Sequence, residues 1–222
     1  MLTLLSALRN CAFIAIAILW SNLVVAQELE LGVYGGFQTS PHSPTSFVDA
    51  GGREKNFAAG WEGQSFVPPL YWGLRGLLWS ETGWGLGAEF THAKVVADDD
   101  TLSKSGFQRL QFTDGINILT ANGFRRWGHA DIRWAPYLGA GLGISIPHVE
   151  VDGNGVSVSE YQLTGPAIRW VGGISYALSN DLSLFSEYNG TYSLNSVDLG
   201  AGATLDTKII TNSVNMGISY RF

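Results

Sequence analysis

Apolar and polar residues alternate strictly at the carboxyl-terminal end of the chain. Positions 213–222 divide into two sets: Val214, Met216, Ile218, Tyr220 and Phe222 in one, and Ser213, Asn215, Gly217, Ser219 and Arg221 in the other. A period of two is the pattern of a β-strand, because successive side chains of a strand point to opposite faces of the sheet. We therefore predict a terminal strand with one apolar face and one polar face.

The same alternation recurs upstream. In residues 28–38, Leu29, Leu31 and Val33 alternate with glycine and mainly polar residues, and residues 182–192 repeat the pattern. Eight segments are predicted as strands: 28–38, 70–79, 84–95, 112–126, 135–148, 164–177, 182–193 and 207–222. Their lengths suit a membrane, because a tilted strand crosses one in about 9–11 residues.

The connections between these strands alternate in length. Short turns are expected near 81–83, 128–131 and 179–181, and long loops at 39–69, 96–111, 149–163 and 194–206. Outer-membrane barrels have short periplasmic turns and long extracellular loops, and an even number of strands places both termini in the periplasm. The expected fold is therefore all-β: an eight-stranded antiparallel up-and-down transmembrane β-barrel of the outer-membrane type, with long extracellular loops.

The positions of charged and aromatic residues favour this barrel over a soluble one. A soluble eight-stranded barrel has a polar outside, whereas here the charged residues share a face with glycine and serine, opposite the aliphatic face. Aromatic residues near the predicted strand ends would form interfacial girdles: Trp72, Trp84, Trp127, Trp134, Trp170 and Tyr220. The terminal Phe222 is typical of the strand by which bacterial barrels are inserted.

The first 26 residues have the layout of a secretory signal peptide. Arg9 supplies a positive charge, residues 11–20 form an apolar run that is too short to span a membrane, and Ala26 closes the predicted cleavage site. We expect residues 27–222 to form one barrel domain, a monomer in contact with the outer-membrane bilayer. Cleavage would remove the only cysteine, Cys11, and so exclude disulfides. A net charge of −6 without basic clusters argues against a nucleic-acid partner.

Charged residues are also predicted inside the barrel. The inward parity carries Tyr34 and six charged residues: Glu30, Arg75, Glu89, Arg169, Glu187 and Arg221. Because side chains fill an eight-stranded barrel, we expect a plug of salt bridges and no water-filled pore; a proton path or a catalytic carboxylate pair is the alternative. A strip of small residues, Gly139, Gly141 and Gly143, would leave room for the long Arg and Glu side chains.

Histidines and carboxylates gather at the predicted extracellular end. His42, His92 and His148 fall there, with acidic residues in the adjoining loops. Such a set can bind Zn, Fe, Mn or Cu, although a surface role is the simpler interpretation for each histidine alone. Strict alternation points His92 and His148 toward lipid, and a β-bulge near the rim would turn them away from it. The run Asp98–Asp100 is either a solvated loop or a site for Ca²⁺ or Mg²⁺.

The first long loop is too aromatic for a disordered segment. It carries Phe47, Phe57, Trp61, Phe66 and a Pro68-Pro69 pair. Long ordered loops are often functional lids, and the alternative is a plug folded over the mouth of the barrel.

Several longer segments carry a family resemblance. They are residues 39–43 (TSPHS), 59–63 (AGWEG), 85–95 (GLGAEFTHAKV), 97–102 (ADDDTL), 112–115 (FTDG), 147–151 (PHVEV) and 160–166 (EYQLTGP). In their order and in their residues, these segments resemble the lipid A oxidase family of α-proteobacterial outer-membrane proteins. The resemblance covers nearly all of the mature chain. The resemblance implies an enzyme that binds lipopolysaccharide and oxidises the proximal glucosamine of lipid A to 2-aminogluconate. The reaction uses O₂ and releases hydrogen peroxide.

Dioxygen chemistry without an organic cofactor usually needs a redox metal such as Fe, Cu or Mn, for which His and carboxylates are suitable ligands. The candidate metal ligands are His42, His148, Glu62 and Asp98. Either Glu150 or Asp114 would be the base that takes the proton of the sugar hydroxyl.

Two other functions remain open. One is a structural or adhesive small barrel whose interior charges only fill the core. The other is a narrow channel for small hydrophobic molecules with a lateral opening beside Pro136, Pro147 or Pro166, because proline interrupts strand pairing.

Overall fold

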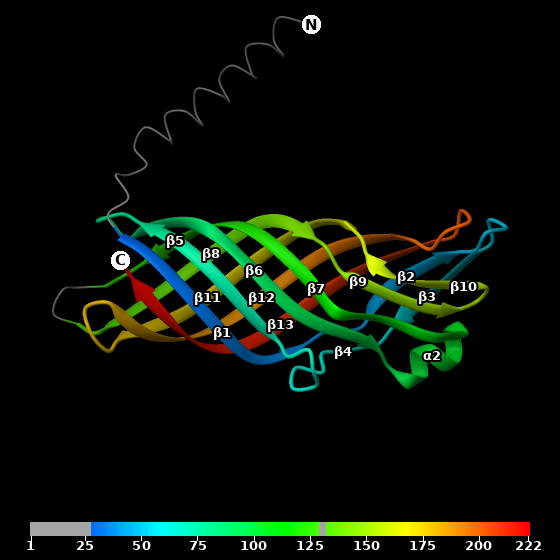
Figure 1. Ribbon diagram of the computed structural model, residues 1–222, viewed down its shortest axis with the longest axis horizontal. Helices are drawn as coiled ribbons and strands as arrows, with labels where there is room; N and C mark the ends of the chain where they lie inside the picture. Colours follow the sequence, from blue (N-terminus) through cyan, green and yellow to red (C-terminus); the bar gives the residue numbers. More distant parts are fainter. Residues whose placement is uncertain (1–27, 129–131) are drawn as a thin grey trace, which may run out of the picture.

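The computed structural model describes residues 28–128 and 132–222, and it confirms the predicted barrel. Eight long strands form the wall: β1 (Glu28–Thr39), β5 (Trp72–Trp79), β6 (Trp84–Ala97), β7 (Phe107–Arg126), β8 (Trp134–Ser145), β11 (Gly165–Ala177), β12 (Leu182–Asp198) and β13 (Thr204–Arg221). Each pairs antiparallel with the next, and β1 pairs with β13, so that the sheet closes on itself (Figure 1).

Strand β1 shows how the sequence pattern becomes the barrel wall. Leu31 lies opposite Tyr220 on β13 and opposite Gly76 on β5. Its side chain is exposed, as is that of Val33, whereas the side chain of the next residue, Tyr34, points inward and is buried. Exposed aliphatic residues recur around the whole ring. They form the apolar band that an outer-membrane barrel presents to lipid.

The short turns and both ends of the described chain lie at the same end of the barrel (Figure 1). In the first turn, the N–H of Gly83 donates to the carbonyl of Ser80, and Gly83 has a φ of 80°, which glycine adopts without strain. The turn predicted at 128–131 falls largely on residues 129–131. These residues and the predicted signal peptide lie outside the described part of the chain.

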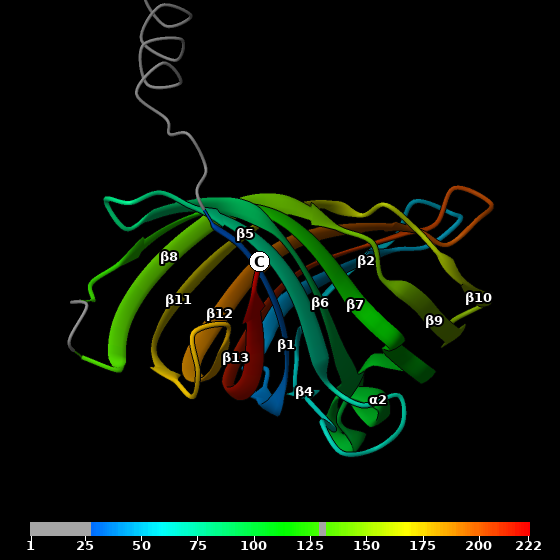
Figure 2. The same cartoon turned by 60° about the vertical axis from the view of Figure 1, so that its left-hand side comes forward.

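The four segments predicted as long loops lie at the opposite end of the barrel. They contain strands and a helix, so the predicted loop boundaries were wrong. The first contains strands β2 (Ser43–Val48), β3 (Glu54–Ala59) and β4 (Trp61–Glu62); the second contains helix α2 (Asp99–Ser105); the third is the hairpin of β9 (His148–Gly153) and β10 (Val156–Tyr161). In place of the fourth, β12 and β13 pair as far as Asp198 and Thr204. These segments prolong the barrel beyond the membrane band as an extracellular extension (Figure 2).

The extension has an apolar interior, in contrast to the polar lumen below it. Phe47 of β2 packs edge-on against Phe107 of β7 at 5.1 Å between ring centroids, and Trp61 lies 5.9 Å from Phe112. All four side chains are buried. Most aromatic residues of the first loop therefore form a core that caps the barrel. Phe66 is the exception, because it lies exposed on the outer wall.

Helix α2 closes one side of this core. Asp98 caps its N-terminus by accepting a hydrogen bond from the N–H of Thr101, and Gly106 ends the helix in the left-handed conformation. The hydroxyl of Thr101 in turn accepts from the N–H of Gly60 at 2.7 Å. Within the described ranges, no helix is long and apolar enough to cross a membrane.

Candidate functional site

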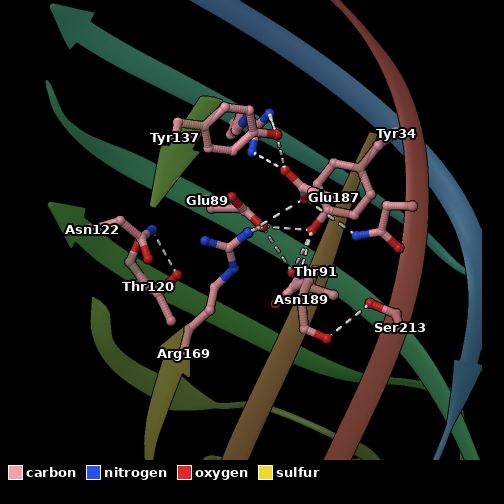
Figure 3. Close-up of polar contacts among 12 residues, drawn as sticks. Tyr34, Glu89, Thr91, Thr120, Asn122, Tyr137, Arg169, Glu187, Asn189 and Ser213 are labelled. Carbon is pink, nitrogen blue, oxygen red and sulfur yellow. Dashed lines mark hydrogen bonds and ion pairs between the residues drawn. The ribbon is translucent and has the colours of Figure 1, made fainter. Parts of the chain in front are cut away.

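The centre of the lumen holds an ion-pair network (Figure 3). Arg169 of β11 lies between two carboxylates, 2.7 Å from Glu89 on β6 and 3.7 Å from Glu187 on β12. Arg75 of β5 pairs with Glu187 at 2.7 Å. The hydroxyl of Tyr34 donates to Glu89 at 2.5 Å. The predicted interior charges are therefore inside and paired, as expected for a salt-bridge plug.

Aromatic rings support the guanidinium of Arg75. It lies 4.1 Å from the ring centroid of Phe185 and 5.5 Å from that of Tyr137. The glycine strip on β8 faces inward as predicted. The space beside it is occupied by side chains of β7 and not by the charged residues. A Cβ at Gly139 would meet the ring of Phe124.

A second group of charges closes the periplasmic end of the lumen. Arg126 pairs with Glu28 at 3.1 Å and with Glu30 at 3.5 Å, while Arg221 lies 3.6 Å from Glu28. Glu30 and Arg221 were predicted inside, whereas Arg126 and Glu28 were not named among the interior charges. Both follow the inward parity of their strands: Glu28 shares it with Glu30, and Arg126 shares it with the buried Phe124.

The described part of the lumen is therefore filled around this network. Between Arg75, Phe124 and Phe185 the remaining space is about 10 Å³, and a single water needs roughly 10–15 Å³. The wall is also paired at two of the prolines that were expected to open it. Pro136 lies opposite Ile174 and Pro166 opposite Ile144 in the β8–β11 ladder. The lateral opening predicted beside them is not present.

A β-bulge at the extracellular rim creates the second polar cluster. The pairing of β6 with β7 shifts between Ala93 and Val95, and Gly115 on the bulged strand has a φ of 90°. His92 lies against Gly115 and hydrogen-bonds the side chain of Asn117 at 2.8 Å. The expected bulge is thus confirmed, although His92 stays on the outer wall.

Three of the predicted site residues meet beside this bulge. Nδ1 of His148 lies 3.4 Å from Glu150 and 3.7 Å from Asp114. The ring of Tyr161 packs edge-on against His148 at 4.7 Å. From the girdle residue Trp127, β7 needs 13 residues to reach Asp114. At ~3.3 Å per residue and a tilt of about 40°, Asp114 lies about 30 Å above that girdle, at the level of the lipid headgroups.

Glu150 is held as a carboxylate in this outer-wall cluster. Partial burial opposes its ionisation, but hydrogen bonds from Thr113 and Gln111, with the charges of His148 and Arg109, outweigh burial and lower the pKa of Glu150. The Gln111 amide donates to the carboxylate at 2.8 Å. These donors already occupy both carboxylate oxygens. Glu150 is therefore better suited to pair electrostatically with His148 than to bind a metal ion.

The other predicted metal ligands do not join this cluster. His42 lies in an external groove, and Glu62 is exposed on β4, where it accepts a hydrogen bond from Gln64. Hydrogen bonds from Thr101 lower the pKa of Asp98, with a smaller contribution from His42. Across residues 28–128 and 132–222, no three His, Cys, Asp or Glu side chains are arranged to hold a metal ion. The described residues thus do not fit the expected redox metal.

The external groove is a concave surface of about 780 Å³ on the extension. It lies between the β2–β3 hairpin and the outer ends of β11, β12 and β13. Its exposed apolar residues include Ala58 and Leu194, and His42, Asp206 and Lys208 supply polar groups. Only His42 among these residues was predicted as a site residue, because the groove forms only once distant strands have paired.

Comparison with known proteins gives a fold but no family. Neither a protein family nor a curated protein matches the sequence. The crystal structure of Neisserial surface protein A matches 87% of this chain and 97% of its own, with 11% identity and a TM-score of 0.50. The solid-state NMR structure of outer membrane protein AlkL in lipid bilayers matches 88% of this chain and 90% of its own, with 16% identity and a TM-score of 0.50.

The chain is a small outer-membrane β-barrel. Identities this low bear on the fold alone. The fold, with its outward apolar band, places the protein in the outer membrane and in contact with the lipid bilayer.

Proposed function

We propose that this small barrel is a closed structural and adhesive protein that works through its extracellular surface. The supporting observation is the filled lumen. Arg75, Glu89, Arg169 and Glu187 neutralise one another in the centre, and an apolar core caps the outer end. Such an interior favours a role at the surface of the barrel over transport through it. Among the solved barrels with a similar fold, Neisserial surface protein A is named a surface protein, which agrees with the proposal.

The extracellular groove is the surface through which we expect binding. Ser196 lines it and is exposed, so that Ser196→Trp would fill it without disturbing the lumen. Ser157→Trp is the matched control, because Ser157 is an exposed serine on β10 outside the groove.

Surface attachment of three strains tests the proposal, each compared with a strain that lacks the protein. Cells with the wild-type chain or Ser157→Trp should attach more strongly, whereas cells with Ser196→Trp should attach no better than the deletion strain. The amount of folded protein in the outer membrane is measured alongside, by its shift in electrophoretic mobility on heating. Attachment that does not depend on the protein would refute the adhesive role.

Oxidation of lipid A is a second candidate, favoured by one observation. The cluster of Asp114, His148 and Glu150 faces outward at headgroup level, where the sugar of lipid A lies, and the family resemblance implies this substrate. In the implied reaction, the reducing-end carbon of the glucosamine loses two electrons and two protons to O₂, which becomes hydrogen peroxide, and water supplies the oxygen atom that completes the acid. Glu150 or Asp114 would accept the hydroxyl proton. No step is assigned to a metal.

Mass spectrometry of lipid A decides this second candidate. Lipid A from cells that express the protein should gain the mass of one oxygen atom, only in the presence of O₂. Replacing His148 with Ala should abolish the gain, whereas Asp152→Asn, on the same strand, should not. If the mass spectrum of lipid A is unchanged in cells that contain the well-folded protein, the oxidase candidate is refuted and only the structural and adhesive role remains.

A further inference from the structure

An apolar finger projects from the outer wall of the barrel. Residues 65–70 read Ser-Phe-Val-Pro-Pro-Leu, without a charge. The exposed fractions are 72% for Phe66, 49% for Val67 and 53% for Leu70. A contiguous exposed apolar run of this kind usually marks a contact with a partner or a membrane. In Figure 1 the segment forms a loop that stands out beside β4.

Both ends of the finger are fixed to the barrel. The hydroxyl of Ser65 accepts a hydrogen bond from the N–H of Gln38 at 2.7 Å, and the N–H of Tyr71 donates to the carbonyl of Ser65 at 3.0 Å. The Tyr71 side chain enters the lumen, where its hydroxyl lies 2.9 Å from that of Ser213. The finger is therefore a short ordered loop with a closed base, held in one position.

The level of the finger follows from Phe37. Phe66 stacks on Phe37 with 6.2 Å between ring centroids, and Phe37 lies opposite Val214 in the β1–β13 ladder. Val214 lies six residues from the girdle residue Tyr220. At ~3.3 Å per residue and a tilt of about 40°, this places it about 15 Å above the girdle. The apolar band of such barrels is ~25 Å tall, so Phe66 lies at hydrocarbon depth.

A hollow separates the finger from the wall. It has a volume of about 340 Å³; Phe37, Phe66 and Val67 line it on the side of the bilayer, and Thr39, Glu62 and Gln64 line it on the side of the extension. Phe37 is itself part of the lipid-facing wall, so the hollow is continuous with the surface that the bilayer covers. Beneath the finger, the buried ammonium of Lys94 donates to the carbonyl of Pro68 at 3.3 Å. The finger thus also shields a cation from the hydrocarbon.

We propose that the finger inserts into the outer leaflet and holds lipid acyl chains in the hollow against Phe37. Its apolar side chains would cost free energy in water, and at this depth they meet hydrocarbon instead. The contact anchors the extracellular extension to the membrane surface. It does not depend on what the extension binds or modifies.

Spin labels on single cysteines test this insertion, because the mature chain has no cysteine of its own if the predicted signal peptide is removed. Three variants of the mature protein, refolded into phospholipid vesicles, carry the label: Val67→Cys in the finger, Met216→Cys on the lipid-facing wall and Ser157→Cys on the extension. Met216 and Ser157 are both exposed and supply the lipid and water references.

The measurement is the collision rate of each label with O₂, which concentrates in hydrocarbon, against a water-soluble nickel chelate. The ratio of the O₂ collision rate to the nickel-chelate collision rate should be the same for the labels at 67 and 216. For both, it should be several-fold higher than for the label at 157. Adding Phe66→Ser should move the label at 67 toward the value at 157 while the heat-dependent mobility shift stays intact. A label at 67 that already matches the one at 157 would overturn the proposal.

Discussion

Arg169 lies between Glu89 and Glu187 in the middle of the barrel, 2.7 Å from the first carboxylate and 3.7 Å from the second. The three side chains come from three different strands, and each is at most 1% exposed. The guanidinium therefore links β6, β11 and β12 across the lumen. Charges this deeply buried are tolerated because they are paired, so the pairing governs how the barrel responds to substitution.

Replacing Arg169 with Met should lower the free energy of unfolding by about 3–5 kcal/mol, because it leaves the carboxylate of Glu89 buried without its main counter-ion. Urea titration of the protein in phospholipid vesicles measures the change. Arg53→Met is the control, since the Arg53 side chain is 88% exposed, and it should change the free energy by less than about 0.5 kcal/mol. Equal effects of the two substitutions would contradict the central role of the buried pair.

Tyr34→Phe removes one hydroxyl from the same network. That hydroxyl donates to Glu89 at 2.5 Å and lies 2.9 Å from the Thr91 hydroxyl, so its loss removes a buried hydrogen bond to a carboxylate that keeps its ion pair with Arg169. We expect a decrease of about 1–3 kcal/mol in the free energy of unfolding. Tyr188→Phe provides the comparison, because the Tyr188 hydroxyl makes a hydrogen bond on the outer face. A larger loss for Tyr188→Phe than for Tyr34→Phe would show that the interior bond is dispensable.

Gly143→Ala tests the close approach of β7 and β8. A Cβ at Gly143 would lie 1.9 Å from the carbonyl oxygen of Leu119, so the backbone must move. Overpacking of this kind costs about 1–3 kcal/mol. Gly123→Ala is the matched control, because the nearest atom to its Cβ, on Leu86, is 3.9 Å away. We expect refolding yield and urea stability to fall for the first variant and to stay unchanged for the second.

The barrel itself could be predicted because the pattern that indicates each strand lies within that strand's own sequence. Period-two alternation fixes which side of the wall each residue faces, and it placed Glu89, Arg169 and Glu187 inside correctly. It could not give the partners, since Arg169 meets its carboxylates only after strands far apart in sequence have closed into a ring. The glycine strip shows the same limit, because its space is filled by Phe124 of the neighbouring strand.

The extension and the outer-wall cluster were harder to predict. The chain from Asp98 to Gly106 carries a helix start and a helix end, and these signals were available although the segment was predicted as a loop. The bulge at Gly115 breaks the alternation that the prediction relied on. As a result, Asp114, His148 and Glu150 were named one by one but not as a cluster, and the proposed metal ligands combined residues from separate parts of the extension.

The outer-wall cluster should lose stability in acid. The pKa of Glu150 is lowered from its ordinary value of 4.5, so its carboxylate stabilises the folded hairpin of β9 and β10. This contribution is fully present above the ordinary pKa, and it disappears as the pH falls through the lower pKa of the folded state. Amide hydrogen exchange in β9, corrected for the intrinsic effect of pH, should therefore show more frequent local opening in acid than at neutral pH. Glu150→Gln should remove most of this dependence, whereas Glu160→Gln, which removes an exposed carboxylate from the same hairpin, should keep it. Acid opening that persists in Glu150→Gln would assign the dependence to other groups.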